Sequence, residues 1–415
     1  MNDNAGATQP ETSAPEPVTS RSEDLLVADW VEGVERSTMR EMLSLGARPD
    51  VLSFALGLPT TDLLPRQGYA AALAESLESD QLSLQLGPPF QPLKQEIVAL
   101  MAQRGVTCHE GQIFLTTGAQ QGLNLLTRLL LNEGGQVIVE DTAYTGLKMA
   151  LQPHRPRILT VSTDPQHGIN LDEVEQLLAD GARPAFIFAM SDGHNPLGIS
   201  LSQEKRERLA GIARRHHVPV VEDDVYGLLN YDRAPIAPIR ALDAQWVFYV
   251  GSFSKILGPG LRTGWLVVPE SLIPRLSIVK DLSDIDSCTL TQRAVTLYLR
   301  SDEFPRQLDA TRREFRERRD LMVRALTDHL AFAQWEAPAS GLFIWLRLPS
   351  GLDSAELLKI AVERERVAFI PGKAFSFNES KHANECLRLN FTFCRRDEIE
   401  EGIRRLARVL EGVIG

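Results

Sequence analysis

The feature that most constrains the fold is a regular alternation of strand-like and helix-like segments between residues 113 and 252. The strand-like runs are almost continuously apolar, which is typical of strands buried on both faces of a sheet. They are residues 113–118, 136–141, 157–161, 184–190, 218–224 and 246–252. Amphipathic segments with helical periodicity separate them, at 119–131, 171–181 and 202–217. This order predicts an α/β fold with a mostly parallel sheet that helices cover on both sides.

The pattern changes after about residue 290. A long charged helical stretch at 303–330 precedes short apolar runs and a final amphipathic helix at 395–413, which predicts a smaller α+β domain. The chain of 415 residues is also longer than one hydrophobic core usually organises. We therefore predict a large domain over residues 61–290 and a small C-terminal domain over residues 291–415.

Composition argues against several classes of partner. Residues 1–22 are rich in Ala, Pro, Thr, Ser and Glu, and we expect them to be disordered because they can bury little apolar surface. A net charge of −11 makes the chain a poor binder of nucleic acid or anionic membranes. Its densest basic stretch, residues 312–319, is interrupted by Glu314 and Glu317 and is expected to be a solvated helix face. No apolar run approaches the roughly 20 residues that span a bilayer.

The cysteines and histidines predict neither disulfides nor a metal site. The four cysteines are far apart and form no CxxC pair, which fits a reducing cytoplasm. The adjacent His216 and His217 would point in different directions on a helix, so they make a poor pair of metal ligands. We expect a cytoplasmic protein without a metal ion, a nucleic-acid partner or a membrane anchor.

The sharpest motif follows the strand-like run at 246–252. Ser252, Ser254 and Lys255 stand at its end, and a Gly- and Pro-rich loop with Arg262 comes next. Strand ends of this kind carry ligands in α/β sheets, and hydroxyls with a forked guanidinium suit a phosphate dianion. A lysine beside them can form an imine with an aldehyde if its pKa is lowered. The alternative is a surface lysine and arginine on a loop.

Two further motifs also lie at strand ends. Gly118, Ala119 and Gln120 open a helix whose free N–H groups can bind an anion, although many such turns contain glycine. Asp223, in the run VEDDVY at 221–226, can pair with the nitrogen of a pyridine ring. One of the neighbouring acids can instead be only a helix N-cap.

The last two motifs supply polar groups for a substrate. HNPLG at 194–198 is a turn signal, and the Asn195 side chain can hydrogen-bond a ring hydroxyl. Arg388 stands within the apolar run LRLNF at 387–391, where it needs a buried anion or a ligand. A substrate α-carboxylate would satisfy it with two hydrogen bonds.

In this order and spacing, the motifs SxSK, PGLRxGW, NPxG, DxxY and RLNF resemble the fold-type I pyridoxal 5′-phosphate (PLP) dependent aminotransferases of class I/II. The similarity is greatest to the subgroup of 2-aminoadipate aminotransferases and the catalytic domains of MocR-like regulators, and it runs from about residue 30 to the C-terminus. The resemblance implies a PLP cofactor, a large domain with a seven-stranded, mostly parallel sheet, and a homodimer with a shared active site.

The resemblance also assigns roles to residues. Lys255 would be catalytic and would form the internal aldimine, and Arg388 would bind the substrate α-carboxylate. The segment 23–60 would cover the active site, so that Gly57 and Arg40 are further candidates for contacts with the substrate. For Arg40, a surface helix arginine is the alternative. The implied cofactor contacts are Gly118, Ala119, Gln120, Tyr144, Asn195, Asp223, Tyr226, Ser252, Ser254, Lys255 and Arg262, and Asn195 would also contact the substrate.

The sequence departs from the family pattern around the substrate. QLGPPFQPLK at 85–94 stands where the family usually has QYGPTEGYPPLR, so Leu86 replaces a tyrosine that commonly reaches the phosphate of a neighbouring subunit. FALGLP at 54–59 replaces the commoner FAGGLP, and HNPLG replaces QNPTG. The cofactor-anchoring residues are all present, so these changes bear on substrate identity more than on the cofactor.

Three functions remain open from the sequence. The first is transamination between an L-amino acid and a 2-oxo acid, with 2-oxoglutarate as the usual acceptor. The second is another PLP reaction on an amino acid, by a lyase, decarboxylase, cyclase or oxidase. The third is a ligand-sensing domain as in MocR-like regulators, which carry a DNA-binding module before the PLP domain. Only about 30 residues precede the match, which are too few for that module.

Overall fold

A computed structural model describes residues 29–32, 48, 50–232, 234–378 and 381–414. The chain divides into two units, residues 1–35 and 36–415. In the first unit the described residues form the short helix α1 (Asp29–Glu32). The predicted tail at 1–22 and Arg40 lie outside the described residues. All that follows concerns the second unit.

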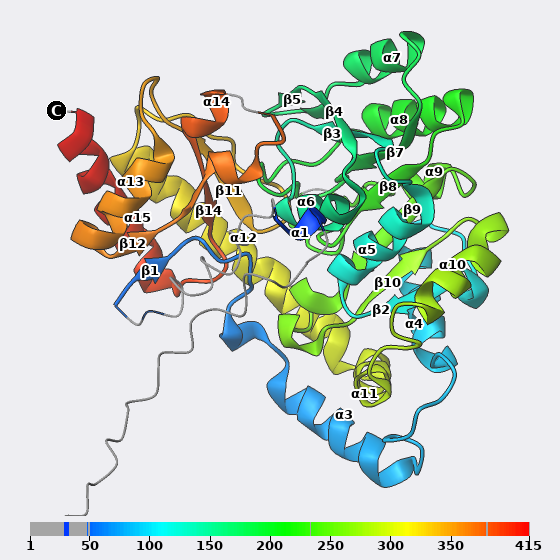
Figure 1. The fold of residues 1–415 in the computed structure, drawn as a ribbon. Helices are drawn as coiled ribbons and strands as arrows, with labels where there is room; N and C mark the ends of the chain where they lie inside the picture. Colours follow the sequence, from blue (N-terminus) through cyan, green and yellow to red (C-terminus); the bar gives the residue numbers. More distant parts are fainter. Residues whose placement is uncertain (1–28, 33–47, 49, 233, 379–380, 415) are drawn as a thin grey trace, which may run out of the picture. The chain divides into compact units, whose positions relative to one another are not determined.

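The larger part of this unit is built on a seven-stranded sheet in the order β2-β10-β9-β8-β7-β3-β4 (Figure 1). Strands β9, β8, β7, β3 and β4 are parallel, and β10 is antiparallel to both of its neighbours, β2 and β9. The strands are β2 (Ile113–Thr116), β3 (Gln136–Glu140), β4 (Arg157–Val161), β7 (Pro184–Ala189), β8 (Val220–Asp223), β9 (Val247–Ser252) and β10 (Gly264–Val267). The mostly parallel α/β sheet is therefore confirmed, whereas strand β10 was not among the strands expected from the sequence.

The continuous apolar character of the strands follows from burial on both faces. In β7, Phe186 and Phe188 belong to one hydrophobic core, and Ile187 and Ala189 belong to another on the opposite face. Alternate residues of a strand point to opposite faces, so a strand between two cores has no polar face. Helices α7 (Leu171–Ala179), α8 (Gln203–His216) and α9 (Ile239–Leu242) contribute to the second core.

The other helices of this part pack against the first core or extend from it. They are α3 (Arg66–Ser79), α4 (Gln91–Gln103), α5 (Ala119–Leu130), α6 (Thr145–Leu151), α10 (Ile273–Asp281) and α11 (Thr289–Arg300). A small hairpin, β5 (Thr163–Asp164) with β6 (Gly168–Ile169), follows β4.

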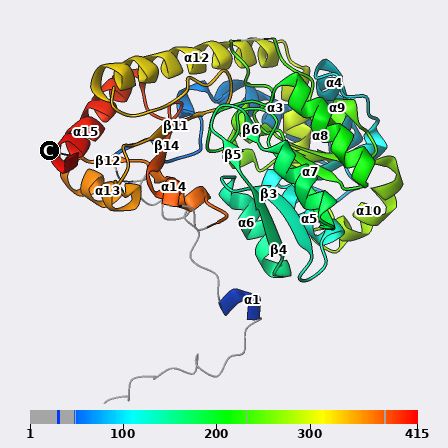
Figure 2. The ribbon, with the colours of Figure 1, turned by 90° about the horizontal axis from the view of Figure 1, so that it is seen from above.

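The C-terminal part forms a second, smaller sheet. Its three antiparallel strands, β11 (Phe343–Arg347), β14 (Cys386–Asn390) and β13 (Ile370–Pro371), lie in that order. The long helix α12 (Glu303–His329) runs from the large part to this sheet and packs against α15 (Arg396–Ile414) (Figure 2). Helices α13 (Ser354–Ile360) and α14 (Lys381–Asn384) complete it. This arrangement matches the predicted α+β region, and the boundaries at residues 60 and 290 stay predictions.

Two details differ from the sequence-based expectations or add to them. The basic stretch at 312–319 lies on α12 as expected, but Arg318 and Arg319 are buried, with Arg318 donating to the Thr392 carbonyl (3.2 Å) and Arg319 to the Pro338 carbonyl (2.7 Å). Strand β1 (Leu52–Ser53) pairs in parallel with β12 (Val367–Ala368), so the segment after residue 50 is joined to the smaller part.

Among the described residues, no helix is both long and apolar enough to cross a bilayer.

Candidate active site

Lys255 lies at the end of a tight turn that its serine neighbours shape. Strand β9 ends at Ser252, whose hydroxyl accepts a hydrogen bond from the Ser254 amide (3.1 Å) and so begins the short 3₁₀ helix Phe253–Lys255. The Lys255 amine donates to the Gly57 carbonyl (2.7 Å). Burial lowers the pKa of Lys255 to about 8, and the Arg388 and Arg262 cations add to this effect. At pH 7, a lysine with a pKa of about 8 has far more of its nucleophilic neutral form than an ordinary lysine has.

The predicted phosphate-binding residues converge on one corner of the sheet. Strand β10 brings the ends of β2 and β9 together, because Gly264 lies opposite both Thr116 and Ser252. Gly118 begins helix α5 with a φ of +78°, and a Cβ on it would lie 2.5 Å from the Arg262 Nη2. The backbone N–H groups at the start of α5 therefore lie beside a guanidinium and serine hydroxyls. This arrangement suits a dianion.

Gln120 and Tyr144 are linked through helix α6. The Gln120 side chain donates to the Gly146 carbonyl (2.8 Å), and Tyr144 is the residue that precedes α6. Burial raises the pKa of Tyr144 to about 12, and the Asp223 carboxylate contributes in the same direction. The Tyr144 phenol therefore stays neutral near pH 7, as an aromatic ring that stacks on a cofactor would.

Asp223, at the end of β8, is a buried acid with an unused hydrogen-bonding atom. It is 1% exposed, and its Oδ1 has no hydrogen-bond partner among the described residues. Burial raises its pKa to about 7, although a backbone hydrogen bond and the charge of Lys255 oppose the shift. A buried oxygen without a partner is costly unless a ligand supplies a donor. The nitrogen of a protonated pyridine ring is such a donor.

Arg388 projects from β14 into the same site. It donates to the Asn195 side chain (2.8 Å) and to the Ala55 carbonyl (2.5 Å), while its Nε has no partner among the described residues. Its guanidinium carbon lies 4.1 Å from the centre of the Phe343 ring and 5.0 Å from that of Phe375. Burial lowers its pKa to about 10, although the group remains a cation at pH 7. Two aromatic rings thus hold a buried cation whose Nε is free for an anionic ligand.

Gly57 lies in a strap, residues 55–58, that is fastened to the smaller sheet. The Asn390 side chain donates to the carbonyls of Leu56 and Leu58, and the Thr392 hydroxyl also donates to Leu58. A Cβ on Gly57 would lie 3.5 Å from the Phe343 ring. The strap therefore brings Gly57 next to both Lys255 and Arg388.

Comparison with known proteins decides the family. The family model "Aminotransferase class I and II" matches residues 49–406. The chain belongs to this family. Family membership confirms the predicted fold class, the aminotransferase activity and the PLP cofactor.

Individual relatives agree with the family. This aminotransferase is 34% identical to 2-aminoadipate transaminase of Thermus thermophilus, over 92% of this chain and 95% of the relative. It is 32% identical to aromatic-amino-acid aminotransferase 1 of Thermococcus litoralis, over 91% and 92%. Among solved structures, α-aminoadipate aminotransferase from Thermus thermophilus, complexed with N-(5′-phosphopyridoxyl)-L-leucine, superposes with a TM-score of 0.86 at 32% identity, covering 94% of this chain and 98% of that one.

The described residues of this aminotransferase fit PLP. The Asp223 oxygen lacks a partner, the turn at Gly118 has no room for a Cβ, and a lysine amine with a lowered pKa lies in the same site. Tyr226 and Asn195 are likewise buried nearby, at 3% and 4% exposure. The structure therefore brings together every predicted site residue that it describes. Arg40 lies outside the described residues.

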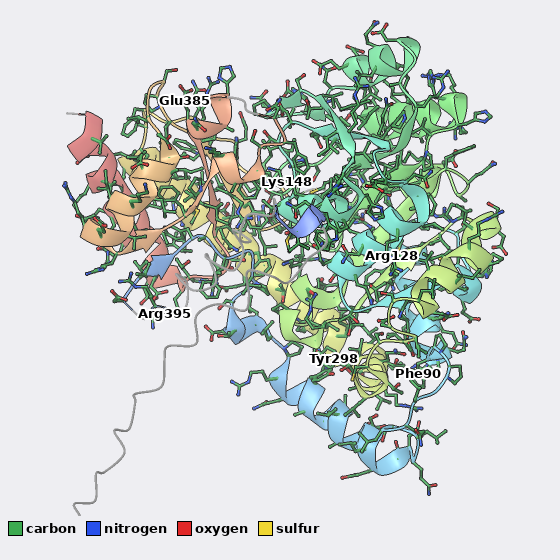
Figure 3. All side chains as sticks on the ribbon, in the orientation of Figure 1. Phe90, Arg128, Lys148, Tyr298, Glu385 and Arg395 are labelled. Atoms are coloured by element: carbon green, nitrogen blue, oxygen red, sulfur yellow. The ribbon has the colours of Figure 1, made fainter. Side chains whose placement is uncertain are left out.

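The loop that departs from the family pattern is exposed. Leu86 is 67% exposed, and Leu82 and Leu84 near it are also exposed. The ring of Phe90 (Figure 3) lies against Arg293 of α11, 4.5 Å from its guanidinium carbon. Within the chain, Phe90 thus packs on a helix rather than on the cofactor site.

Sequence reasoning missed several residues of the site. Phe343 and Phe375 hold Arg388, but in the sequence they look like ordinary core residues of short apolar runs. Glu222 was not resolved from its acidic neighbours, and it accepts from the Ile239 and Arg240 amides (2.7 and 2.8 Å) at the start of α9. The sequence left open an N-cap aspartate in this run, whereas α9 begins after Pro238 and its first two amides are bound by Glu222 from β8.

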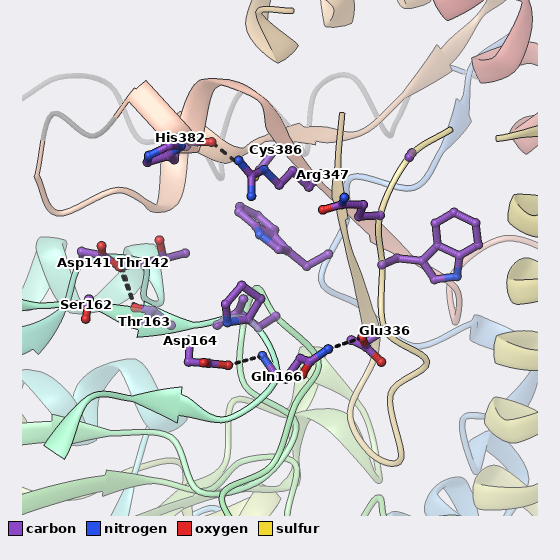
Figure 4. A pocket seen from close by; sticks show the side chains of 17 residues that line it. Asp141, Thr142, Ser162, Thr163, Asp164, Gln166, Glu336, Arg347, His382 and Cys386 are labelled. Atoms are coloured by element: carbon purple, nitrogen blue, oxygen red, sulfur yellow. Dashed lines mark hydrogen bonds between the residues drawn. The ribbon is translucent and has the colours of Figure 1, made fainter. Parts of the chain in front are cut away.

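A separate hollow of about 810 Å³ lies between the ends of β3 and β4 and the smaller sheet (Figure 4). Gln166 and Glu336 on its wall are hydrogen-bonded (2.7 Å), and Trp345 and Arg347 of β11 line it as well. None of the predicted cofactor or substrate residues that the structure describes lines this hollow. It is therefore distinct from the active site.

Proposed function

We propose that this aminotransferase moves the amino group of an L-amino acid to a 2-oxo acid, with 2-oxoglutarate as acceptor, and that Lys255 carries the cofactor. The observation that carries the proposal is the environment of the Lys255 amine. It is bonded to the Gly57 carbonyl, its pKa is lowered to about 8, and the charges that act on it are those of Arg388, Arg262 and Asp223. A carboxylate-binding arginine, a phosphate-binding arginine and a ring-binding acid are what PLP and an amino acid require.

The proposed division of work follows from the positions of the groups. PLP, when bound, supplies an aldehyde for an amine and a ring that accepts electrons. The Lys255 Nζ would take the proton from the substrate Cα and return it as a general base and acid. Asp223 Oδ1 would hold the ring nitrogen in its protonated form. Its buried position keeps competing water away from this ion pair.

The remaining contacts would anchor the cofactor at its edges. Ser252, Ser254 and Arg262, with the amides of Gly118, Ala119 and Gln120, would bind the phosphate. Asn195 and Tyr226 would hydrogen-bond the ring oxygen, and Tyr144 would stack on the ring. These assignments are supported by the convergence of β2, β9 and β10 and by the burial of Asp223, Tyr226 and Asn195.

For the substrate, we assign the α-carboxylate to Arg388 and the space beside it to Gly57 and Asn195. The guanidinium would exchange its bond to the Ala55 carbonyl for a pair of bonds to the carboxylate. The relatives named above suggest aromatic amino acids and 2-aminoadipate as donors to test first. Arg40 is assigned a distal substrate carboxylate.

The proposal extends to assembly and location. We propose a cytoplasmic homodimer with a shared active site, built from chains with a large domain at 61–290 and a small domain at 291–415. Support for the dimer comes from the exposed apolar side chains of Leu82, Leu84 and Leu86, which a second subunit would cover. Light scattering coupled to size-exclusion chromatography would report the mass of the assembly.

Absorbance spectroscopy of the purified protein tests the proposal. A visible band that PLP produces with wild-type protein, and not with Lys255→Ala, supports the lysine assignment. Loss of this band on adding one amino acid without an oxo acid, with one equivalent of 2-oxo acid released, supports transamination and identifies the donor. Release of ammonia or CO₂ instead would contradict transamination. Absence of any band in the wild type would contradict the role of Lys255.

A further inference from the structure

We infer that Arg104 is a positioning residue that fixes the three chain segments holding the cofactor ring, an inference that rests on the proposed function. Arg104 follows helix α4 and its side chain is only 4% exposed. It does not belong to the site described above, and no motif in the sequence marks it.

Two of the three acceptors of Arg104 directly follow a proposed ring contact, and the third lies three residues before one. Arg104 donates to Asp224 (2.7 Å), which follows Asp223. It also donates to the carbonyl of Gly227, which follows Tyr226. Its third acceptor is Asp192 (3.0 Å), three residues before Asn195.

Other buried groups hold the acceptors in place. Arg206 donates twice to Asp192, at 2.9 and 3.3 Å, and binds the carbonyls of Ser191 and Leu201. The Tyr249 hydroxyl donates to the same Asp224 oxygen as Arg104 (3.0 Å). Both arginines and both acids have side chains that are at most 4% exposed. The result is a buried network that joins the ends of β7 and β8 to α4.

The geometry requires a guanidinium and a glycine. Three acceptors in different directions match the planar fork of arginine, whereas the single ammonium of lysine is a compact point charge. A Cβ on Gly227 would lie 2.6 Å from the Arg104 Nη2, so the backbone approaches the guanidinium as only glycine allows. Buried ion pairs add little net stability but leave a costly uncompensated charge when one partner is removed. We therefore assign the network the task of placing Asp223, Tyr226 and Asn195 relative to one another, which a binding site needs to within about 0.5 Å.

Arg240 provides a matched control. Like Arg104 it is buried, with an exposed fraction of 1%. Its guanidinium donates to the carbonyls of Ala244, Val247 and Val268 at 2.6, 2.6 and 3.2 Å. None of these three residues adjoins a proposed ring contact. The backbone amide of Arg240 donates to Glu222, the neighbour of Asp223, but Arg240→Lys keeps that amide. The variant therefore reports what losing a buried guanidinium does to stability without removing a hydrogen bond to the three segments.

The test compares Arg104→Lys, Arg240→Lys and wild type by thermal unfolding, by PLP titration of the apoenzymes, and by the pH dependence of the visible band of the bound cofactor. We expect both variants to unfold at lower temperature. Only Arg104→Lys should raise the dissociation constant of PLP, by about tenfold or about 1.4 kcal/mol, and shift the midpoint of the spectral pH titration. A PLP affinity and spectrum of Arg104→Lys equal to those of Arg240→Lys would overturn the inference.

Tyr249→Phe keeps the test decisive if Arg104→Lys does not fold. This variant removes one of the two side-chain hydrogen bonds that the Asp224 carboxylate accepts, and it keeps the aromatic ring in the core. We expect the same shift of the spectral midpoint, with a smaller loss of PLP affinity. A spectrum identical to that of the wild type would overturn the inference. If the wild type gives no band with PLP, the proposed function fails and the inference fails with it. If the wild type gives a normal band and the variants show the same PLP affinity and the same spectral midpoint, only the role of Arg104 is refuted.

Discussion

Asp223→Asn should change how the stability of the apoenzyme depends on pH. In the folded chain, burial raises the pKa of Asp223 from its ordinary value of 3.8 to about 7. Between these two values the folded state keeps a proton that the unfolded chain releases. The folded wild type therefore loses stability as pH rises through this window, by about 1.4 kcal/mol per pH unit.

Asparagine resembles the neutral acid and cannot titrate, so the variant escapes this loss. Its stability relative to wild type should rise by about 1.6 kcal/mol between pH 5.5 and pH 7, because Asp223 of the folded wild type is already half ionised at pH 7. The difference should level off above about pH 8. Titrating groups that do not interact with Asp223 contribute equally in both proteins and cancel in the difference. Lys255 does interact with it, but its pKa of about 8 lies above this interval.

The assay is urea unfolding of both apoenzymes at half-unit intervals from pH 5.5 to 8.5, with the exposed Asp180→Asn as a surface control. Adding PLP should narrow the difference, since only wild type gains an ion pair with the cofactor ring. A stability difference that stays constant over the whole range would refute the assignment of Asp223 as a buried acid with a raised pKa.

Three further predictions concern the other groups of the site. Lys255→Ala should abolish imine formation with PLP. In the wild-type apoenzyme, the rate at which the visible imine band forms should rise as pH increases through about 8, where the Lys255 amine loses its proton. Stopped-flow absorbance measures both effects. Gly118→Ala places a Cβ within 2.5 Å of the Arg262 side chain at a φ of +78°. It should therefore cost about 1–3 kcal/mol of stability and weaken PLP binding. An unchanged PLP affinity by titration would count against the proposed phosphate site. Arg388→Lys loses paired hydrogen bonds to a carboxylate, so it should cost about 2–5 kcal/mol of transition-state stabilisation, measured as a fall in kcat/KM, while PLP affinity stays near wild type. Steady-state kinetics with equal kcat/KM for both proteins would exclude Arg388 as the carboxylate ligand.

The sheet was predictable because burial on both faces leaves a local trace in the sequence. The runs at 184–190 and 246–252 are almost continuously apolar, and the structure confirms them as strands β7 and β9, which are buried along nearly their whole length. Strand β10 was missed because its four residues follow directly on the loop of Arg262 and lack a helix before them, so the strand–helix alternation gives no sign of them. Chemical motifs were equally local, since Ser252, Ser254 and Lys255 lie within four residues of one another.

Contacts between distant segments left no such trace. Arg388 and Asn195 are 193 residues apart, and Arg104 and Asp224 are 120 apart. Phe343 appears in the sequence as one more apolar residue of a strand, and only the fold shows that its ring faces a guanidinium. Arg318 and Arg319 were expected in solvent because their neighbours are charged, whereas their partners, including the Thr392 and Pro338 carbonyls, come from segments that helix packing brings near.

The strap at residues 55–58 has a consequence for anyone who tries to alter substrate preference. One of its carbonyls holds the amine of Lys255 and another holds the guanidinium of Arg388, while Asn390 and Thr392 fix the strap to the smaller sheet. A backbone shift that enlarges the space beside Gly57 would move both groups at once. Selectivity and turnover are therefore linked traits in this segment, and libraries that vary it should be screened for both in the same round.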